Sequence, residues 1–190
     1  TAVETATLAE VSDGRFILGI GAGDRPLLAL GMAPARLKQL EEAISLVRRL
    51  ISGEHVSGSS GAYELSDAHL QFPSSHDVPI FVSASGPRTL EMAGRIADGV
   101  IALCGLDPIS INWALEQIDR GAEQAERPRP HVSVFAYGAV SEDPSEAMAA
   151  ARPIAAWFPQ TSPLYCDLLG LNSEVAEQVR SGYSGGEFQE

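Results

Sequence analysis

Lysine and cysteine are scarce in this sequence of 190 residues. Lys38 is its only lysine, and 13 Lys and Arg residues stand against 25 Asp and Glu, which gives a formal net charge of −12. A protein that binds the phosphates of nucleic acid or coats an anionic membrane needs charge of the opposite sign. No uninterrupted apolar run reaches the roughly 18 residues of a membrane span. We therefore expect a cytoplasmic protein that has neither nucleic acid nor a membrane as its partner.

The cysteines and histidines form none of the common metal-binding or disulfide patterns. Cys104 and Cys166 lie far apart and form no CxxC pair, so a disulfide framework is not indicated. The four histidines show neither HExxH nor a Cys/His cluster. The sequence therefore predicts no metal site and favours a reducing compartment.

Apolar runs typical of buried strands alternate with segments of helical periodicity. Helices are expected at 2–11, 36–51, 88–97, 108–125 and 147–157, and strands at 16–20, 79–83, 99–103 and 132–140. The first of these strands has no polar alternation, which is typical of a strand covered on both faces. The clearest helix is 36–51, because apolar residues recur every three or four positions along it. These are Leu37, Leu40, Ile44, Val47 and Ile51.

The order of these elements limits the fold to two architectures. Strands that are each followed by a helix imply a parallel sheet with right-handed crossovers. Both a doubly wound sheet and part of a (β/α)₈ barrel fit this order, and periodicity does not choose between them. We treat residues 1–190 as one domain, in which the polar stretch 57–77 is an irregular insertion with one short hairpin at about 63–72.

In both architectures ligands bind at the carboxyl ends of the strands. These ends are predicted at 21–24, 84–88, 104–107 and 138–141. The first is glycine-rich, but a dinucleotide fingerprint needs glycine where Asp24 stands, and Pro26 breaks the required turn into a helix. Asp24 itself is either a proton donor or polar contact at the site, or a turn aspartate bonded to its own backbone.

The turn from strand 79–83 into the following helix is suited to binding an anion. Gly86 permits close approach of a phosphate, while Ser85 and Thr89 carry hydroxyl donors and Arg88 carries a positive charge. The N–H groups and the dipole at the start of a helix also favour an anion. The alternative is an ordinary turn with a capping serine.

Other charged residues indicate structural roles. Asp98 precedes a strand, on the side of such folds that serves stability. Glu41, Glu42, Arg48 and Arg49 are expected to form a solvated face of the helix 36–51.

Three segments resemble a known family when taken in order: EVSDGRFILGIGAGD, LEEAISLVRRLISGEHV and PIFVSASGPRTLEMAGRIADGVIAL. They are similar to the bacterial luciferase-like superfamily of flavin- or deazaflavin-dependent oxidoreductases. The likeness is closest to its coenzyme F420-dependent methylenetetrahydromethanopterin reductase branch. It runs from about Thr1 to Tyr137, and more faintly to Glu190.

The resemblance implies an α/β fold, a (β/α)₈ TIM barrel with insertions, of which this chain covers roughly strands four to seven. In the family, the turn that matches 84–87 holds the cofactor phosphate through backbone N–H groups. The loop that matches 103–105 lies along the cofactor tail, and the turn that matches 21–24 lines the mouth. The implied cofactor-binding residues are Gly23, Ala84, Ser85, Gly86, Pro87, Arg88, Cys104 and Gly105.

The activity implied by the resemblance is hydride transfer between coenzyme F420 and a small organic substrate. Catalytic acids in the family usually come from early strands that this sequence does not contain, and Asp24 is the best candidate within it. One alternative is an FMN-dependent monooxygenase of the same fold, and another is a non-catalytic flavin-binding relative. Members of the family often form dimers, so a homodimer is an expected assembly.

Overall fold

The computed structural model describes all residues except 24–26, 28–29, 61–62, 172, 185–186 and 189–190. The chain divides into two compact units, each described here by itself. The first comprises Thr1–Ala102 and Gln117–Ser133, and the second comprises Leu103–Glu116 and Val134–Glu190. That 1–190 form a single domain stays a prediction.

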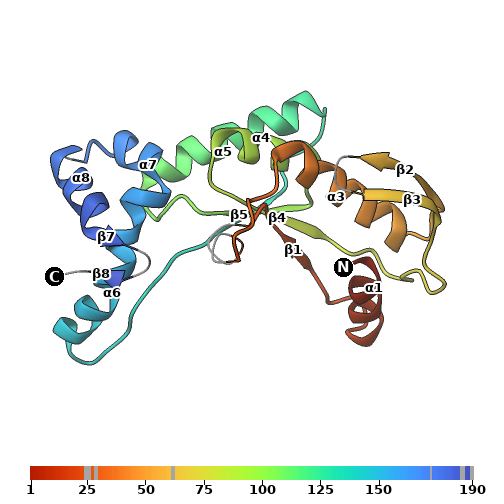
Figure 1. Cartoon of the computed structure of the whole chain (residues 1–190), viewed down its shortest axis with the longest axis horizontal. Coiled ribbons are helices and arrows are strands. Elements are labelled where there is room, and N and C mark those ends of the chain that lie inside the picture. The colour runs from red at the N-terminus through yellow and green to blue at the C-terminus, as the bar shows by residue number, and fades with distance from the viewer. Residues whose placement is uncertain (24–26, 28–29, 61–62, 172, 185–186, 189–190) are drawn as a thin grey trace. The chain divides into compact units, whose positions relative to one another are not determined.

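A four-stranded sheet organises the first unit, in the order β1-β4-β5-β6 (Figure 1). β1 (Leu18–Ile20) pairs in parallel with β4 (Ile80–Ala84), and β4 pairs in parallel with β5 (Gly99–Ala102). β6 (His131–Val134) is the next neighbour of β5. The parallel sheet expected from the sequence is confirmed for β1, β4 and β5.

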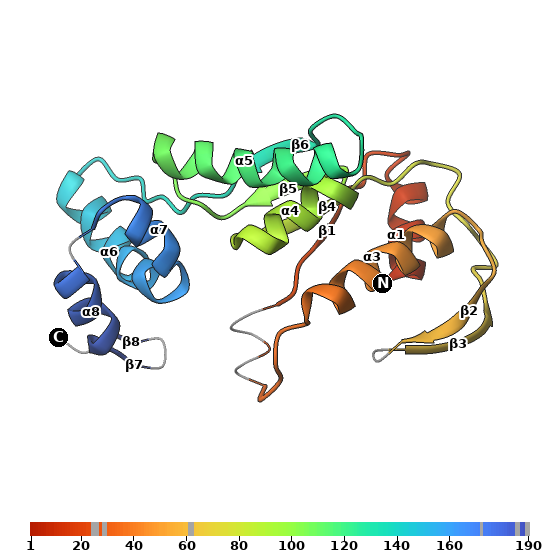
Figure 2. The ribbon, with the colours of Figure 1, turned by 90° about the horizontal axis from the view of Figure 1, so that it is seen from above.

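Helices cover one side of this sheet. α4 (Pro87–Ile96) contacts both β4 and β5, and Figure 2 shows it lying over them. α3 (Leu37–Ile51) packs on α4, and α1 (Ala2–Val11) packs on α3. The bounds of α1 are those predicted, and α3 buries its apolar stripe as expected. The fully buried members of that stripe are Leu40, Ile44, Val47 and Ile51.

The two faces of the sheet differ in burial. On β4 the alternate residues Ile80, Val82 and Ala84 are buried, whereas Phe81 and Ser83 between them are only half-buried. In a strand, successive side chains point to opposite faces, so one face is covered and the other is partly open. The prediction that the first strand is covered on both faces is therefore wrong: in β1 Gly19 is exposed.

Glycines let two helices approach very closely in the first unit. α5 (Pro108–Gln124) crosses α4 so tightly that a Cβ atom on Gly94 would collide with the backbone carbonyl of Ile118. A Cβ atom on Gly121 would likewise collide with the carbonyl of Glu91. Only glycine fits at these two positions, so the crossing fixes α4 against α5.

The connection between α3 and β4 contains an antiparallel hairpin, formed by β2 (Val56–Ser60) and β3 (Tyr63–Ala68). The hairpin predicted at about 63–72 is therefore placed too late in the chain. The glycine and serine residues at 58–60 look like a loop in the sequence, but their backbone pairs with residues 63–65. Gly58 adopts φ +150° where the register shifts, which explains a glycine inside a strand.

The second unit is mainly helical. It contains α6 (Pro144–Thr161), α7 (Pro163–Leu168), α8 (Ser173–Gly182) and a short pair of strands, β7 (Tyr183–Ser184) and β8 (Glu187–Phe188). Asp143 caps α6, since its carboxylate accepts a hydrogen bond from the Ser145 N–H at 2.8 Å. The strand expected at 132–140 is too long, because β6 ends at Val134 and the residues that follow have no strand structure.

Among the described residues, no helix has both the length and the apolar character needed to cross a membrane. Cys104 and Cys166 are both buried free thiols.

Candidate functional site

The turn that joins β4 to α4 begins at the carboxyl ends of the parallel strands. Gly86 is the N-cap of α4, with extended backbone angles of φ −85° and ψ 157°. Its carbonyl accepts the N–H of Leu90 at 2.9 Å, and Pro87 occupies the first helical position. Proline is preorganised for that position and lacks an N–H. The N–H groups of Gly86, Arg88 and Thr89 therefore have no partner within the helix and are the ones that a helix start directs outward.

The surface at Gly86 is open. A Cβ atom added there would meet no atom within 4 Å, and its φ is one that any residue adopts. The fold itself therefore does not require glycine at this position. A missing side chain at the positive end of a helix leaves room for an anion against the backbone.

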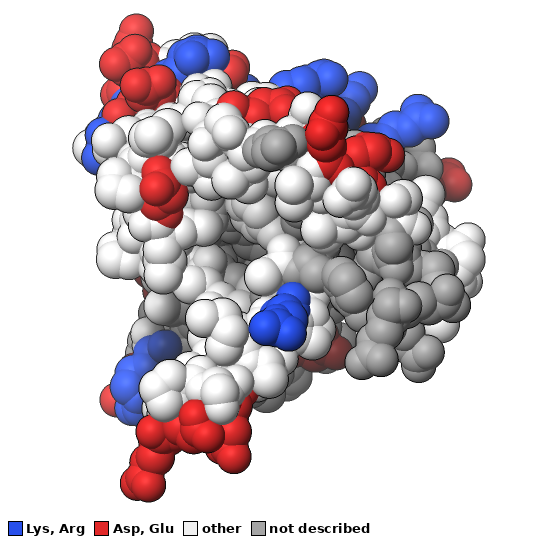
Figure 3. Space-filling model, turned by 90° about the vertical axis from the view of Figure 1, so that its left-hand side faces the viewer, with Lys and Arg blue, Asp and Glu red and all other residues white. Residues whose placement is uncertain are grey.

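Arg88 adds a cation beside this opening. Its side chain is exposed and, within the described part of the chain, has no hydrogen-bond or ion-pair partner. Lys and Arg side chains appear as separate groups rather than one continuous area among the described residues of the face drawn in Figure 3. A local cation at a helix start fits a single phosphate better than a polyanion.

The end of β1 lies beside the end of β4. A Cβ atom on Gly21 would stand 3.3 Å from the Cβ of Ser83, so these two residues are neighbours at the carboxyl edge. Gly23 follows with φ +80°, a conformation that favours glycine. The fold thus brings Gly23 and the turn at Ser85 to one edge of the sheet. Asp24 lies outside the described residues.

Cys104 and Gly105 belong to the second unit. The Cys104 thiol is buried and lies 3.5 Å from the carbonyl oxygen of Gly105. Burial raises the pKa of this thiol, so it stays protonated at neutral pH. Burial also raises the pKa of the neighbouring Tyr165 well above its usual value. Cys104 can therefore contact a ligand through its backbone groups, but not through a thiolate.

The opposite ends of β4 and β5 are held by charged side chains. The Asp98 carboxylate accepts hydrogen bonds from the backbone N–H of Ile80 and from Arg48, each at 2.9 Å. Arg48 also donates to the carbonyl of Ile96 at 3.2 Å. These contacts agree with the structural role predicted for Asp98.

The solvated helix face predicted on α3 is wrong for two of its four residues. Arg48 binds Asp98, and Glu41 accepts a hydrogen bond from Arg95 of α4 at 2.7 Å. Both side chains are partly exposed, but each forms an ion pair with a neighbouring segment of the first unit, because α3 packs on α4. Periodicity in the sequence marks the apolar stripe, but it carries no information on which polar residues border it.

One group of chemistry-bearing residues was missed by sequence reasoning. His55, Asp67 and His69 lie together on the β2–β3 hairpin, with one ligand atom of each within 4.8 Å of the others. Their separation along the chain matches no metal motif. The signal that could have found them is strand pairing: Val56 lies opposite Ala68, which places positions 55 and 69 opposite each other.

Comparisons with known proteins place these features in context. A model of a family described as luciferase-like monooxygenase matches residues 1–188. The 5,10-methylenetetrahydromethanopterin reductase of Methanolobus tindarius is 31% identical over 193 residues, which cover 99% of this chain and 59% of the relative. An F420-dependent glucose-6-phosphate dehydrogenase of Microbacterium testaceum is 36% identical over 145 residues, which cover 73% of this chain and 43% of the relative.

Solved structures agree on the fold. The coenzyme F420-dependent tetrahydromethanopterin reductase from Methanopyrus kandleri superposes with a TM-score of 0.81 at 24% identity, covering 95% of this chain and 58% of that one. An F420-dependent secondary alcohol dehydrogenase superposes with a TM-score of 0.74 at 21% identity, covering 96% and 59%. The architecture is therefore part of a luciferase-like (β/α)₈ barrel, as expected, and not a doubly wound sheet. The chain spans about three fifths or less of the length of these relatives.

Proposed function

Because the chain belongs to the luciferase-like monooxygenase family, we propose that it forms part of an oxidoreductase that uses coenzyme F420 and acts on a small organic substrate. The names of the similar proteins support this cofactor, since both methylenetetrahydromethanopterin reductases and F420-dependent dehydrogenases match the chain at 31–36% identity. The finer proposal is a methylenetetrahydromethanopterin reductase-like activity.

The observation that carries the proposal is the open turn at the start of α4. Coenzyme F420 contains a phosphate, and this turn has the properties that a phosphate requires. Gly86 leaves the backbone uncovered, Pro87 fixes the first helical residue, and Arg88 is an exposed cation. The residues present therefore fit the group. Ala84 ends the buried strand directly before the turn, so the position of the turn is fixed by the sheet.

Each group of residues has a role in this proposal. Ser85, Gly86 and Arg88 bind the phosphate through N–H, hydroxyl and guanidinium donors, and Gly23 lines the same edge of the sheet. The backbone at Cys104 and Gly105 lies along the cofactor tail. When bound, the deazaflavin supplies a carbon that accepts or donates hydride. Asp24 stays the proposed proton donor.

Fluorescence titration of the full chain with F420 and, in parallel, with FMN tests the proposal. Gly86→Asp places a carboxylate where the phosphate would lie, and we expect it to weaken F420 binding by at least about a hundredfold, since like charges in direct contact cost several kcal/mol. Gly170→Asp is the control, because Gly170 is an exposed glycine away from the strand ends at which a Cβ would meet nothing, and aspartate tolerates its left-handed φ of +61°. It should leave binding unchanged.

The outcomes separate the alternatives. F420 binding that Gly86→Asp removes and Gly170→Asp keeps supports the proposal. Binding of FMN but not F420 would move the assignment to an FMN-dependent monooxygenase. F420 binding without turnover of any substrate would favour a non-catalytic relative. The proposal further assumes a reducing, cytoplasmic setting, which the two buried free thiols fit.

A further inference from the structure

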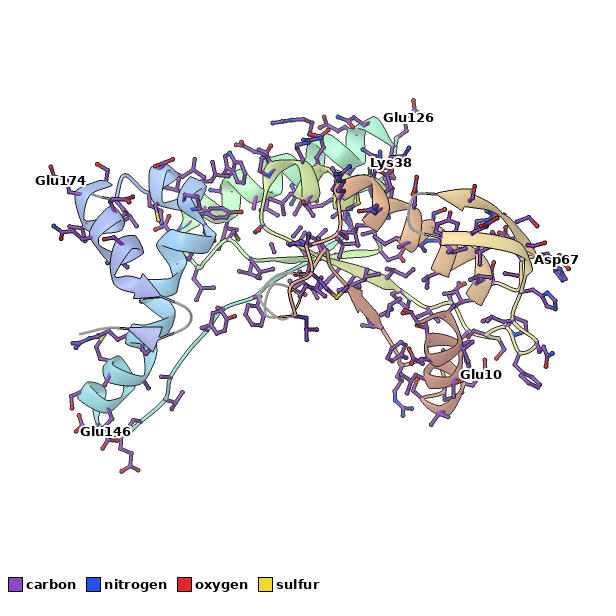
Figure 4. The ribbon with its side chains drawn as sticks, in the orientation of Figure 1. Glu10, Lys38, Asp67, Glu126, Glu146 and Glu174 are labelled. Carbon is purple, nitrogen blue, oxygen red and sulfur yellow. The ribbon has the colours of Figure 1, made fainter. Side chains whose placement is uncertain are left out.

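The β2–β3 hairpin carries a cluster of metal-ligand residues that the F420 proposal does not use. His55 precedes β2, Asp67 lies on β3, and His69 directly follows β3 (Figure 4 labels Asp67). All three side chains are exposed. The hairpin lies in the connection that leads to the amino end of β4, whereas the turn at Gly86, which we propose binds phosphate, follows the carboxyl end of that strand.

Strand pairing brings the three residues to one place. Val56 lies opposite Ala68, so His55 and His69 are cross-strand neighbours just beyond that pair. Their imidazole rings are stacked, with centroids 4.0 Å apart and an angle of 16° between the planes. Asp67 lies beside the shift in strand register, and its carboxylate reaches His55, with Oδ1 2.8 Å from Nδ1 of that ring. The arrangement is a consequence of the hairpin register.

Asp67 is held in a backbone conformation that is rare for residues other than glycine. Its φ is +51°, in the left-handed region. Three contacts keep it there. Its N–H donates to the Ser57 hydroxyl at 2.9 Å, its carbonyl oxygen lies 3.0 Å from His69 Nδ1, and its carboxylate Oδ1 lies 2.8 Å from His55 Nδ1. Such conformations occur often at binding sites.

The distances suit a metal ion. Two ligands bound at about 2.0–2.1 Å to one Zn²⁺ ion stand about 2.8–3.4 Å apart. His55 Nδ1 and Asp67 Oδ1 already have such a separation, at 2.8 Å. A nitrogen of His69 completes the set within 4.8 Å, and because its ring is exposed, it can rotate toward the other two. Two imidazoles and one carboxylate form a donor set typical of Zn²⁺, Co²⁺ and Ni²⁺.

We propose that His55, Asp67 and His69 bind a divalent transition-metal ion, with Zn²⁺ as the first ion to test, and that the ion links the two ends of the hairpin. The metal takes the place of the proton between His55 Nδ1 and the Asp67 carboxylate. Water fills the remaining positions, since only three ligands come from the protein. The ion stabilises the hairpin because it binds the paired strands and not the separated ones.

Calorimetric titration of the metal-free full chain with Zn²⁺ tests this site. We expect one equivalent to bind. His55→Gln, Asp67→Asn and His69→Gln should each weaken binding at least about tenfold, because each removes one ligand of three. Asp67→Asn is the sharpest of these changes, since asparagine tolerates the left-handed conformation and loses only the charge.

His131→Gln is the matched control, because His131 is an exposed histidine of the first unit that lies outside the cluster. It should bind Zn²⁺ as the unchanged chain does. Far-UV circular dichroism checks that every variant keeps its helices. An equal loss of binding in His131→Gln, or unchanged binding in both Asp67→Asn and His69→Gln, would overturn the proposal.

A second measurement needs no variant. On titration with Zn²⁺, the ring-proton NMR signals of His55 and His69 should shift together, while those of His131 stay in place. Visible absorption of bound Co²⁺ should report the same stoichiometry. Shifts spread over all four histidines, or no saturable binding, would show that the cluster is an ordinary cross-strand pair. None of these readouts depends on F420, so the two proposals fail separately.

Discussion

The amino ends and the carboxyl ends of β4 and β5 differ in whether their charged groups have partners within the protein. At the amino ends, Asp98 accepts hydrogen bonds from Ile80 and Arg48, so the charged groups there have partners within the protein. At the carboxyl end of β4, Gly86 leaves an open surface and Arg88 has no partner in the described part of the chain. The amino end uses its polar groups for stability, whereas the carboxyl end of β4 leaves the backbone at Gly86 and the Arg88 side chain open to a ligand.

This difference shows how a barrel fold places stability and ligand binding at opposite ends of its strands. A helix start that binds its own side chains cannot bind a phosphate as well, and a strand end without partners contributes little to folding. (β/α)₈ barrels assign the two roles to opposite ends of their strands. Variants at or near the two ends test that division through their effect on stability. The largest effect is expected first and the smallest last.

The largest effect is expected at the crossing of α4 and α5. Gly94→Ala places a methyl group against the carbonyl of Ile118, so the helices must separate or distort. We expect a loss of about 3 kcal/mol in the free energy of unfolding, measured by urea denaturation. Gly86→Ala changes a glycine of the same helix in open surroundings, and it should cost less than about 1 kcal/mol. Equal losses in the two variants would contradict the crossing as described.

Asp98→Ala is expected to have the next largest effect. It removes the acceptor of both the Ile80 N–H and the Arg48 side chain, and should cost about 2 kcal/mol in urea denaturation. Asp98→Asn keeps an oxygen for the N–H but loses the charge, so about half of this loss is expected. If both variants are as stable as the unchanged chain, the amino end does not carry the stability assigned to it.

The Gly86→Asp variant tests the carboxyl end of β4. The extended backbone at Gly86 is that of an N-cap, where aspartate is a better residue than glycine. We expect the free energy of unfolding to rise by a few tenths of a kcal/mol, although the same variant should lose F420. A clear loss of stability would mean that the turn serves the fold, and the division of roles would fail.

The smallest effect concerns pH. The Ser75 N–H donates to the Glu10 carboxylate at 2.6 Å, and this bond is the main reason that the pKa of Glu10 lies below its ordinary 4.5 (Figure 4 labels Glu10). A lowered pKa in the folded state stabilises the protein above the unfolded pKa, and the benefit is lost as the pH falls through the lowered value.

The measurement is amide hydrogen exchange at Ser75, compared between pH 6 and pH 3. In the unchanged chain, protection of this amide should fall as the pH is lowered, because Glu10 becomes protonated. In Glu10→Gln, protection should be the same at both values, because the amide oxygen can still accept this bond but does not titrate. A pH response that persists in Glu10→Gln would assign the effect to another group.

Most of the first unit could be predicted from the sequence. Apolar periodicity marks α3, and unbroken apolar runs mark β4 and β5, because burial requires these patterns locally. The turn into α4 at Gly86 was also predicted, since helix starts and glycines have local chemistry, whereas its binding of a phosphate stays a proposal. What failed depends on partners distant in the chain: the Gly58–Ser60 strand exists through its pairing with β3, and Arg48 is ordered by Asp98. The cluster at Asp67 was missed for the same reason.

The tight crossing at Gly94 and Gly121 also bears on the proposed phosphate site, because it sets the direction of α4. Gly94 is eight residues along α4 from Gly86, a distance of about 12 Å along a helix axis. Over that length a tilt of about 5° displaces the far end by about 1 Å. A misplacement of about 1 Å can cost an enzyme about a hundredfold in rate. A small tilt of α4 at this contact is therefore enlarged at its amino end. A methyl group at Gly94 would displace the turn at Gly86 and whatever that turn binds.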